Sequence, residues 1–333
     1  MKVCLYLEAN DLLGQSGIGT AIIRQQQALE KAGVEFTTNP ADKDYDLIHI
    51  NTFLPKSLLY AKRMKKQGKR VILHAHTLDV DTKNSFTLSN EIMPFLKRYL
   101  RYFYSQADHI ICPSEYAKNM LIQYGLRNNM SVVSNGVDLG RFSFDEKKRA
   151  AYRERYNLEG MVPFSVGHVF LRKGVRSFVG VAKSFPNTFV WFGKVYSKFL
   201  VSSREVEELI RKRPENVIFT GYVDDILAAY CAGDVFFFPS QAETQGIVIL
   251  EAMACERPVL IRDLPVFDGW LKHDHDCLKA KNDEEFVLYL DKLINEGGLR
   301  KRLVSNAKET VKEHSLEKVG LELKSVYEKV LGS

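Results

Sequence analysis

The 333-residue sequence lacks any apolar run approaching the roughly 18 residues that a membrane-spanning helix needs. It contains only five cysteines, which are scattered and include no Cys-x-x-Cys pair. This usage suits a reducing cytosol, where disulfides are rare. The first residues become polar too quickly for a signal peptide and predict a first strand. These absences favour a chain without a secretory leader or a membrane span.

Composition is ordinary for a globular protein, with 45% hydrophobic and 26% charged residues and no low-complexity tract. The length is too great for a single hydrophobic core and predicts two domains of about 150 residues. The net charge of +6 is unevenly placed. Residues 1–150 hold 21 Lys and Arg against 15 Asp and Glu, whereas residues 151–333 hold 26 of each. The excess in the N-terminal half indicates an anionic partner.

Short apolar runs alternate with amphipathic segments, which is the pattern of parallel sheets covered by helices. The simplest fit is an α/β protein with two Rossmann-like doubly wound domains in tandem. Predicted strands in the first half are Val3–Leu7, Leu47–Ile50, Val71–His74, His109–Cys112 and Ser131–Val133. Those in the second half are Phe164–Val166, Thr188–Phe192, Val217–Phe219, Val235–Phe238 and Val259–Ile261. Helical spacing marks Ala21–Lys31 and Ser57–Gln67.

The boundary between the domains is expected between Asn135 and Val162, where the segment Phe144–Arg155 is highly charged and lacks a strand. We therefore divide the chain into domains 1–145 and 146–314 and a tail, 315–333. Within the tail, Ser315–Leu331 has the apolar spacing of an amphipathic helix.

The segment from Pro239 to Leu260 carries the strongest functional signal. It predicts a strand that ends in a loop at Glu243, followed by a helix over Thr244–Ala254 that Gly246 opens. Glu251 then lies about two turns into that helix. A helix N-terminus at the carboxyl end of a strand favours anions, and carboxylates can hold hydroxyl groups. The pattern therefore indicates a site for a sugar nucleotide, the alternative being an ordinary strand-loop-helix with incidental acids.

This segment resembles the donor signature of retaining glycosyltransferases of the GT-B fold, family 4. Its Glu-Thr-Gln-Gly variant is similar to the bacterial branch that glycosylates diacylglycerol. The resemblance implies two domains facing a cleft, with the last helix crossing back to the first domain. It further implies that Glu251 holds the ribose of UDP and that Glu243 contacts hydroxyls of the donor sugar. The backbone amides beside Glu243 that it assigns to the donor are those of Thr244, Gln245, Gly246 and Ile247.

Two further segments fit a site for a diphosphate. Gly17 and Gly19, in a loop that follows the first strand, would let backbone amides approach a phosphate, although a mere tight turn is the alternative. In the opening of the second domain, the resemblance assigns Lys173 to the leaving diphosphate, where a fixed cation lowers the barrier. The chain departs from the family pattern at His168, where an Arg is usual, and Arg172 is a candidate for the missing charge.

His74 and His76 end the third predicted strand, at the carboxyl edge where α/β proteins bind ligands. The resemblance places a histidine near the acceptor, and we favour His76 over His74. A strand-end histidine bonded to backbone is the competing interpretation. No metal is predicted. Asp79 and Asp81 have the Asp-x-Asp spacing of a different glycosyltransferase fold, and the segment from His273 to Cys277 is read as a polar surface turn.

Two basic segments account for the charge excess, around residues 61–70 and 93–104. The second combines cations with a dense aromatic and aliphatic face, as expected for a helix lying on an anionic membrane surface. No nucleic-acid recognition motif accompanies these charges, so nucleic acid is not expected as a partner. Solvated or purely structural helices are the alternatives. The predicted membrane-binding residues are Lys62, Arg63, Lys65, Lys66, Lys97, Arg98 and Arg101.

Taken together, these features predict a peripheral enzyme on the cytoplasmic face of the cell membrane, with His76, Lys173 and Glu243 as catalytic residues. By the resemblance it moves a hexose from UDP-galactose or UDP-glucose, with a slight preference for galactose, to monoglucosyldiacylglycerol. The product is a diglycosyldiacylglycerol of retained anomeric configuration. Alternatives are a diacylglycerol or soluble acceptor, a UDP-sugar epimerase, and a non-catalytic binding protein.

Overall fold

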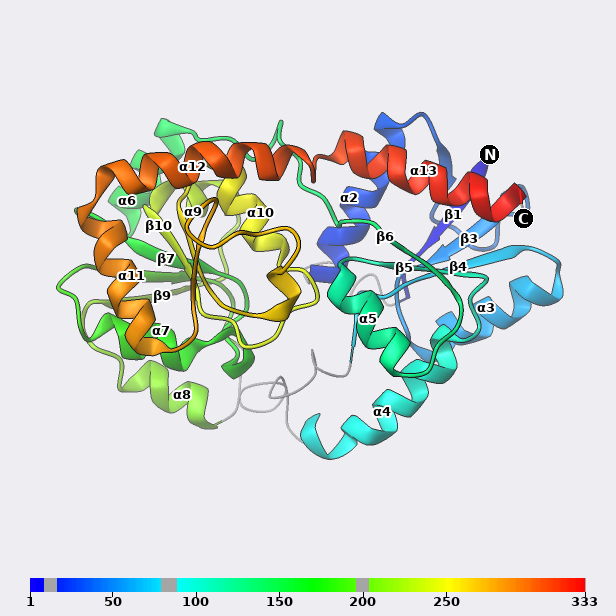
Figure 1. The fold of residues 1–333 in the computed structure, drawn as a ribbon, viewed down its shortest axis with the longest axis horizontal. Helices are drawn as coiled ribbons and strands as arrows, with labels where there is room; N and C mark the ends of the chain where they lie inside the picture. Colours follow the sequence, from blue (N-terminus) through cyan, green and yellow to red (C-terminus); the bar gives the residue numbers. More distant parts are fainter. Residues whose placement is uncertain (9–16, 79–88, 196–203, 333) are drawn as a thin grey trace. The chain divides into compact units, whose positions relative to one another are not determined.

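The structure is a computed structural model that describes residues 1–8, 17–78, 89–195 and 204–332 (Figure 1). The chain divides into two compact units. Of the described residues, the first contains 1–8, 17–78, 92–138 and 314–332, and the second contains 89–91, 139–195 and 204–313. Each unit is built on one six-stranded sheet in which every paired strand is parallel. The prediction of two doubly wound parallel sheets is therefore confirmed.

The first unit has the strand order β2-β1-β3-β4-β5-β6. Its strands are β1 (Lys2–Tyr6), β2 (Glu35–Thr37), β3 (Leu47–Ile50), β4 (Arg70–His74), β5 (His109–Cys112) and β6 (Asn129–Val132). Its helices are α2 (Gly17–Lys31), α3 (Pro55–Lys66), α4 (Ser89–Tyr104), α5 (Glu115–Gln123) and α13 (Leu316–Gly332). Since β2 and β3 lie on opposite sides of β1, the direction of winding changes at β1 and β3. Ligands of such sheets bind beyond the carboxyl ends of the strands at this point.

The second unit has the strand order β12-β11-β10-β7-β8-β9, so its winding changes at β7 and β10. Its strands are β7 (Pro163–Val166), β8 (Phe189–Phe192), β9 (Val217–Gly221), β10 (Val235–Phe238), β11 (Val259–Arg262) and β12 (Leu278–Ala280). The helices are α6 (Glu146–Arg155), α7 (Val175–Ala182), α8 (Arg204–Arg211), α9 (Ile226–Ala232), α10 (Ile247–Ala254), α11 (Asp283–Asn295) and α12 (Gly297–Lys312). Two short 3-10 turns are η2 (Leu171–Lys173) and η3 (Pro265–Phe267).

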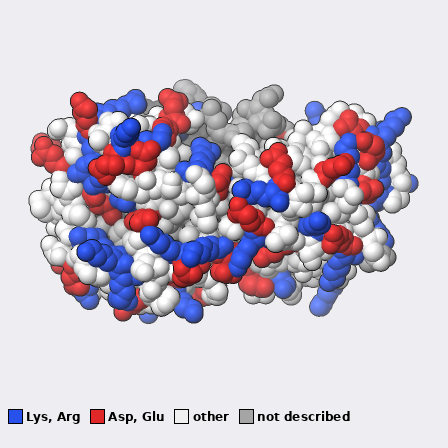
Figure 2. All heavy atoms as spheres, turned by 90° about the horizontal axis from the view of Figure 1, so that it is seen from above, with Lys and Arg blue, Asp and Glu red and all other residues white. Residues whose placement is uncertain are grey.

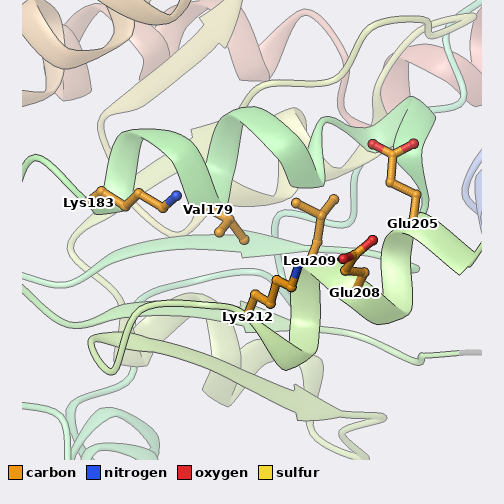
Figure 3. Close-up of a pocket in the computed structure, with 6 residues that line it drawn as sticks. All are labelled: Val179, Lys183, Glu205, Glu208, Leu209 and Lys212. Carbon is orange, nitrogen blue, oxygen red and sulfur yellow. Dashed lines mark ion pairs between the residues drawn. The ribbon is translucent and has the colours of Figure 1, made fainter.

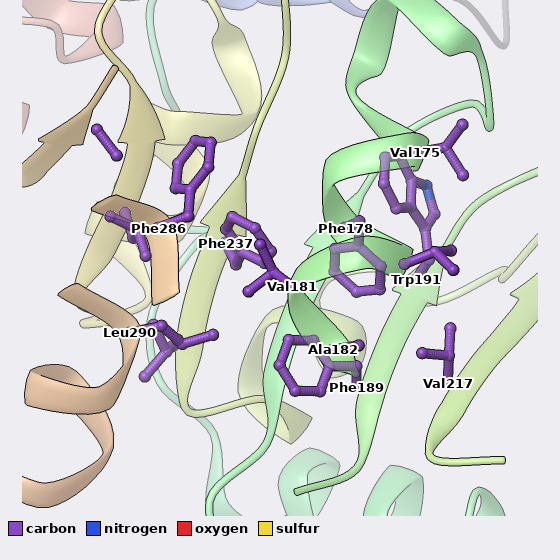
Figure 4. Packing of buried hydrophobic residues seen from close by; sticks show 14 of the residues in the cluster. Val175, Phe178, Val181, Ala182, Phe189, Trp191, Val217, Phe237, Phe286 and Leu290 are labelled. Carbon is purple, nitrogen blue, oxygen red and sulfur yellow. The ribbon is translucent and has the colours of Figure 1, made fainter. Parts of the chain in front are cut away.

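Aromatic side chains fill the core of the second unit. Phe178 of α7 lies between Trp191 of β8 and Phe237 of β10, with ring centroids 5.0 and 5.5 Å away (Figure 4). Close contacts between rings in these orientations add to the free energy gained by burying their apolar area. The core thereby fixes β10, whose carboxyl end carries the strongest sequence signal.

The C-terminal helix α13 completes the core of the first unit. Its residues Leu316, Leu323 and Tyr327 are fully buried in a cluster with residues of α2 and the sheet. A Cβ atom at Gly320 would lie only 2.1 Å from the carbonyl oxygen of Ala28, so glycine lets α13 approach α2 closely. The amphipathic spacing of the tail therefore reflects packing inside a folded unit.

The predicted elements are mostly present, and three differences are informative. The helix predicted over Thr244–Ala254 begins at Ile247, because Gly246 adopts a left-handed conformation with φ of +91°. Strands β2 and β12 were not predicted, since each has three residues and lies at a sheet edge. Such short segments carry too few residues for an alternating pattern to be recognised.

Candidate functional site

The loop after β10 holds a buried carboxylate in a fixed position. Glu243 is 7% exposed, and its Oε1 lies 2.5 Å from Nζ of Lys173. The hydroxyl of Ser240 donates a second hydrogen bond to the same oxygen at 2.7 Å. Burial alone would raise the pKa of the Glu243 carboxyl, but Lys173, Arg172 and the two hydrogen bonds lower it below its ordinary value. Glu243 is therefore an anion whose charge is balanced inside the unit.

The turn that carries Lys173 is fastened to the loop that carries Glu243. The backbone N–H of Gln241 donates to the carbonyl of Arg172 at 2.8 Å, and Nη1 of Arg172 donates to the carbonyl of Ala242 at 2.9 Å. Gly174 has φ of +82°, and a Cβ atom there would lie 2.0 Å from the carbonyl oxygen of Pro239. Only glycine fits this contact. The cation and the carboxylate are thus set against each other by the backbone.

Arg172 and His168 occupy different surroundings in the same region. The guanidinium of Arg172 is bonded to the Glu243 loop, and its charge contributes to keeping that carboxyl ionised. His168 is half-buried and packs against Phe170, with ring centroids 5.7 Å apart. It follows Gly167, whose φ is +134°. Arg172 thus supplies positive charge beside Glu243. His168 lies in the turn after β7 and packs against Phe170.

The short helix α10 presents the second carboxylate. Gly246 precedes the first helical residue, Ile247, and Thr244 and Gln245 lie in the loop before it. Glu251 is 6% exposed and accepts a hydrogen bond from the hydroxyl of Tyr230 in α9. The second unit therefore places Glu243 and Glu251 beyond β10, one balanced by a cation and one bonded to a neutral phenol.

Polar side chains also gather in the first unit, where the winding of its sheet changes. The rings of His74 and His76 are stacked with centroids 3.8 Å apart, and His49 of β3 stacks on His74 at 5.2 Å. Nε2 of His76 lies 2.9 Å from Oδ1 of Asn51, and Nε2 of Gln25 lies 3.0 Å from Nδ1 of His74. Sequence reasoning favoured His76 over His74, and the structure brings both rings into one stack.

With the amides of Gln25 and Asn51 oriented as they are, their hydrogen bonds indicate the protonation of Nδ1 of His74 and Nε2 of His76. The Gln25 amide donates to Oδ1 of Asn51 at 2.9 Å and to Nδ1 of His74, so that nitrogen is an acceptor. His76 must donate through Nε2, because Oδ1 of Asn51 only accepts. Burial lowers the pKa of His49 and of His76 to about 3 and that of His74 well below its ordinary value. All three imidazoles are therefore neutral near pH 7.

The glycine-rich loop is described only in part. Gly17 begins α2 and Gly19 is buried within its first turn, whereas Gly14 lies outside the described residues. A Cβ atom at Gly17 would meet nothing within 4 Å. The fold itself therefore does not require glycine at position 17.

The second basic segment forms α4, and its two sides differ. Leu100, Phe103 and Tyr104 point into the unit and are at most 1% exposed. Phe95 is 77% exposed and Tyr102 is 47% exposed. Part of the aromatic face thus packs inside, as a structural helix would, and part remains on the surface.

Three cations of α3 and α4 contact aromatic rings or backbone of the first unit. Lys62 of α3 lies over the ring of Tyr102 at 5.0 Å, and Lys97 lies over the ring of Tyr124 at 4.7 Å. Lys65 is bonded to the carbonyl of Gln106 at 2.9 Å. The remaining predicted cations, all exposed, are Arg63, Lys66, Arg98 and Arg101. We define the basic face as Leu59, Lys62, Arg63, Lys65, Lys66, Phe95, Lys97, Arg98, Arg101 and Tyr102. By contrast, basic and acidic side chains are interspersed on the face seen in Figure 2.

A hollow of about 230 Å³ lies between α7 and α8, lined by Val179, Leu209 and four charged residues, and none of the predicted site residues lines it (Figure 3).

Within the described ranges, no group of three or more His, Cys, Asp or Glu could hold a metal ion. Asp79 and Asp81 lie outside those ranges. Among the described helices, none is long and apolar enough to span a membrane.

Comparison with known proteins identifies the family. Residues 40–141 match the model described as Glycosyltransferase Family 4, and residues 156–310 match Glycosyl transferases group 1. A protein of Acholeplasma laidlawii named processive diacylglycerol alpha-glucosyltransferase is 37% identical over 339 residues, covering 99% of each chain. The chain belongs to the glycosyl transferases group 1. The alpha-galactosylglucosyldiacylglycerol synthase of Streptococcus pneumoniae is 23% identical over 321 residues. The matched region covers 93% of this glycosyltransferase and 85% of the synthase.

Solved structures agree with this family in fold. HepE of Anabaena, in complex with UDP and glucose, matches with a TM-score of 0.79 and 18% identity over 99% of this glycosyltransferase and all of that chain. Sucrose-phosphate synthase of Thermosynechococcus elongatus matches with a TM-score of 0.81 and 18% identity, covering 100% and 99% of the two chains. The glycosyltransferase thus has the GT-B fold, as its sequence predicted.

Sequence reasoning did not find several partners of the predicted site residues in this glycosyltransferase. Ser240 and Tyr230 bond the two carboxylates, and Gln25, Asn51 and Tyr327 hold the histidine stack. Ser240 lies three positions from Glu243 and could have been considered from spacing. The others are brought to the site by the tertiary fold, so no local sequence pattern predicts them.

Proposed function

We propose that this glycosyltransferase moves a hexosyl group from a UDP-sugar to a diacylglycerol-based acceptor at a membrane surface, with retention at the anomeric carbon. Glucose is the proposed hexose and monoglucosyldiacylglycerol the proposed acceptor, giving a diglycosyldiacylglycerol. The observation that carries the proposal is the 37% identity over the whole chain with a relative named as a processive diacylglycerol alpha-glucosyltransferase.

The arrangement of Lys173 and Glu243 supports the donor side of this proposal. Without a ligand the two groups neutralise each other at 2.5 Å. A diphosphate offers Lys173 a stronger anionic partner, so its arrival frees Glu243 to accept hydrogen bonds from sugar hydroxyls. Ser240 still holds the carboxylate during this exchange. Charge on the leaving diphosphate increases as the bond to the sugar breaks, and a fixed ammonium then stabilises the transition state more than the ground state.

The proposed reaction balances without a cofactor. The acceptor hydroxyl oxygen forms a bond to the anomeric carbon, and the bond from that carbon to the UDP oxygen breaks. The acceptor proton passes to a phosphate oxygen of the departing UDP. Attack on the face from which UDP leaves gives retention, which accords with the word alpha in the name of the relative. His76, held neutral by burial, is proposed to orient a hydroxyl of the sugar or the acceptor.

The choice of sugar and acceptor follows the relatives. The sequence alone slightly favoured galactose, whereas the relative at 37% identity is named a glucosyltransferase and the streptococcal relative at 23% a galactosylglucosyldiacylglycerol synthase. The greater identity supports glucose. The word processive in the first name also supports bare diacylglycerol as a second acceptor, with glucosyl groups added in succession.

The basic face supports association with an anionic membrane from the cytoplasmic side. It combines cations with the exposed side chains of Leu59, Phe95 and Tyr102, and Lys62 lies over the ring of Tyr102. Burial of apolar side chains in the membrane interface and attraction of the cations to anionic headgroups both contribute to the free energy of membrane binding. This face would bring the enzyme to an acceptor that does not leave the bilayer.

Product analysis tests the proposal. The purified chain is given monoglucosyldiacylglycerol or diacylglycerol in anionic vesicles, each with UDP-glucose or UDP-galactose, and the lipids are identified by mass spectrometry. The expected product is diglucosyldiacylglycerol from UDP-glucose, with the new linkage α by NMR. Sugar transfer only to a water-soluble acceptor would overturn the lipid assignment. Conversion of one UDP-sugar into another without acceptor would indicate an epimerase.

A further inference from the structure

We propose that Tyr230 is a positioning residue that makes Glu251 selective for a vicinal diol, and therefore for the ribose of the donor nucleotide. The inference rests on the proposed function, in which a ribonucleoside diphosphate is the leaving group. Tyr230 was not among the predicted site residues, and its side chain is a neutral phenol.

Tyr230 is held in one orientation by its surroundings. Its side chain is fully buried, and its ring contacts those of Phe142, Phe164 and Phe236 at centroid distances of 5.9, 6.0 and 6.0 Å. Gly233 permits this packing, because a Cβ atom there would lie 2.0 Å from the ring of Phe164. The phenol hydroxyl therefore has a fixed direction, and that direction is toward Glu251.

The helix that carries Tyr230 is also fixed at both ends. At its start, the carboxylate of Asp225 accepts from the backbone N–H of Ala228 and pairs with Lys148 of α6. At its end, Nη1 of Arg149 donates to the carbonyl oxygens of Cys231 and Ala232. Tyr230 is thus part of a support that is held at both ends, and its hydroxyl holds the Glu251 carboxylate in place.

The chemistry of this pair differs from that of the other carboxylate. Glu243 is matched with the ammonium of Lys173, an arrangement that suits a ligand carrying negative charge. Glu251 receives a hydrogen bond from a neutral phenol, which orients the carboxylate without cancelling its charge. A carboxylate held in one orientation is a strong acceptor for two neighbouring hydroxyl groups. The 2′ and 3′ hydroxyls of a ribose present that pair.

Nucleotide binding measures this role directly. The affinities of UDP and 2′-deoxy-UDP are determined by calorimetry for the wild-type chain and for Tyr230→Phe, which removes only the hydroxyl. We expect the wild type to prefer UDP by about tenfold, the usual value of a hydrogen bond to a charged group. In Tyr230→Phe the preference should fall to about twofold, chiefly through weaker binding of UDP.

Tyr152→Phe is the matched control, because Tyr152 is a buried tyrosine of the same unit whose ring packs near Phe192. It should keep the preference for UDP. Glu251→Gln is a second variant that keeps the side-chain volume and should lose the preference even if Tyr230→Phe is unstable. In steady-state assays Tyr230→Phe should raise KM for the donor with kcat within about twofold, since ribose binding is equal in ground and transition states.

The outcomes separate this role from a merely structural one. Equal weakening of both nucleotides in Tyr230→Phe, or no preference for UDP in the wild type, overturns the inference. If the wild type prefers a nucleotide with another base, the proposed donor is wrong, and the same comparison of ribose with deoxyribose in that nucleotide then decides the role of Tyr230. Failure of lipid glycosylation with a preserved ribose preference would count against the acceptor alone.

Discussion

The hydroxyl of Tyr327 in α13 lies 2.8 Å from Nδ1 of His49 in β3, although 278 positions separate the two residues. Nε2 of His49 lies 3.2 Å from Nδ1 of His74, which is stacked on His76. The C-terminal helix is thus joined by hydrogen bonds and ring contacts to the histidine that the sequence singled out.

Tyr327→Phe should destabilise the first unit. The substitution leaves Nδ1 of a fully buried histidine without its hydrogen bond, which costs about 1–3 kcal/mol. Urea unfolding at pH 7.5 measures the effect, with Tyr222→Phe, an exposed tyrosine, as the control. A change below about 0.5 kcal/mol would show that the Tyr327 hydroxyl contributes little to stability.

The histidine stack should make the protein sensitive to mild acid. His49 and His76 have pKa values of about 3 when folded, against 6.5 ordinarily, so each takes up a proton only on unfolding. Between pH 6.5 and about 3 the unfolded state binds more protons, and stability falls by about 1.4 kcal/mol per pH unit for each histidine. His49→Asn should reduce this slope in urea titrations from pH 7.5 to 5.5, whereas His275→Asn, at an exposed ring, should not.

Lys173→Met should lower the free energy of unfolding, because it removes one partner of the buried ion pair with Glu243. Removing one partner leaves the Glu243 carboxylate buried with its main counter-charge gone, at a cost of about 3–5 kcal/mol near pH 7. The lowered pKa of Glu243 contributes stability above the ordinary value of 4.5, and this contribution is lost as pH falls through the folded pKa. The difference from wild type should therefore shrink in acid. A difference that is constant from pH 7 to pH 3 would contradict this account, and Lys183→Met, at the residue that follows α7, is the control.

Gly174→Ala should impair both stability and nucleotide binding. The added Cβ would lie 2.0 Å from the carbonyl oxygen of Pro239 and would separate the Lys173 turn from the Glu243 loop. Gly269→Ala is the matched control, because Gly269 also has a positive φ, of +91°, but open space around it. That control should cost only the backbone term of about 1–2 kcal/mol. Equal losses in the two variants would mean that the close contact is unimportant.

Charge reversal on α4 should weaken binding to anionic vesicles. Each cation near such a surface contributes about 1 kcal/mol, so Lys97→Glu, Arg98→Glu and Arg101→Glu together should reduce vesicle binding at least about tenfold in flotation. Reversal of Lys301, Lys308 and Lys312 in α12 gives the same change in net charge and is the control. If both triple variants lose binding equally, net charge and not the basic face accounts for the attraction.

Residues that act through local periodicity could be predicted from sequence, and those that act through tertiary contacts could not. Val235–Phe238 was predicted as a strand with its observed bounds, because four consecutive buried apolar residues are bordered by Asp234 and Pro239. The loop position of Glu243 followed from that strand. The start of α10 was placed too early, because a glycine in a left-handed conformation is not distinguishable from a helical one by composition. Tyr230 and Tyr327 were not identified as site partners, since their hydrogen bonds join elements distant in sequence.

The position of α13 has a consequence for the order in which the chain folds. The core of the first unit includes Leu316, Leu323 and Tyr327, which are synthesised after the whole of Leu139–Glu313. Nearly all of the second unit is the continuous stretch Leu139–Glu313, which can fold as soon as it leaves the ribosome, whereas the first unit must wait with part of its apolar surface uncovered. We therefore expect nascent chains that end before α13 to protect the second unit from protease and to leave the first unit sensitive, although its strands were made first.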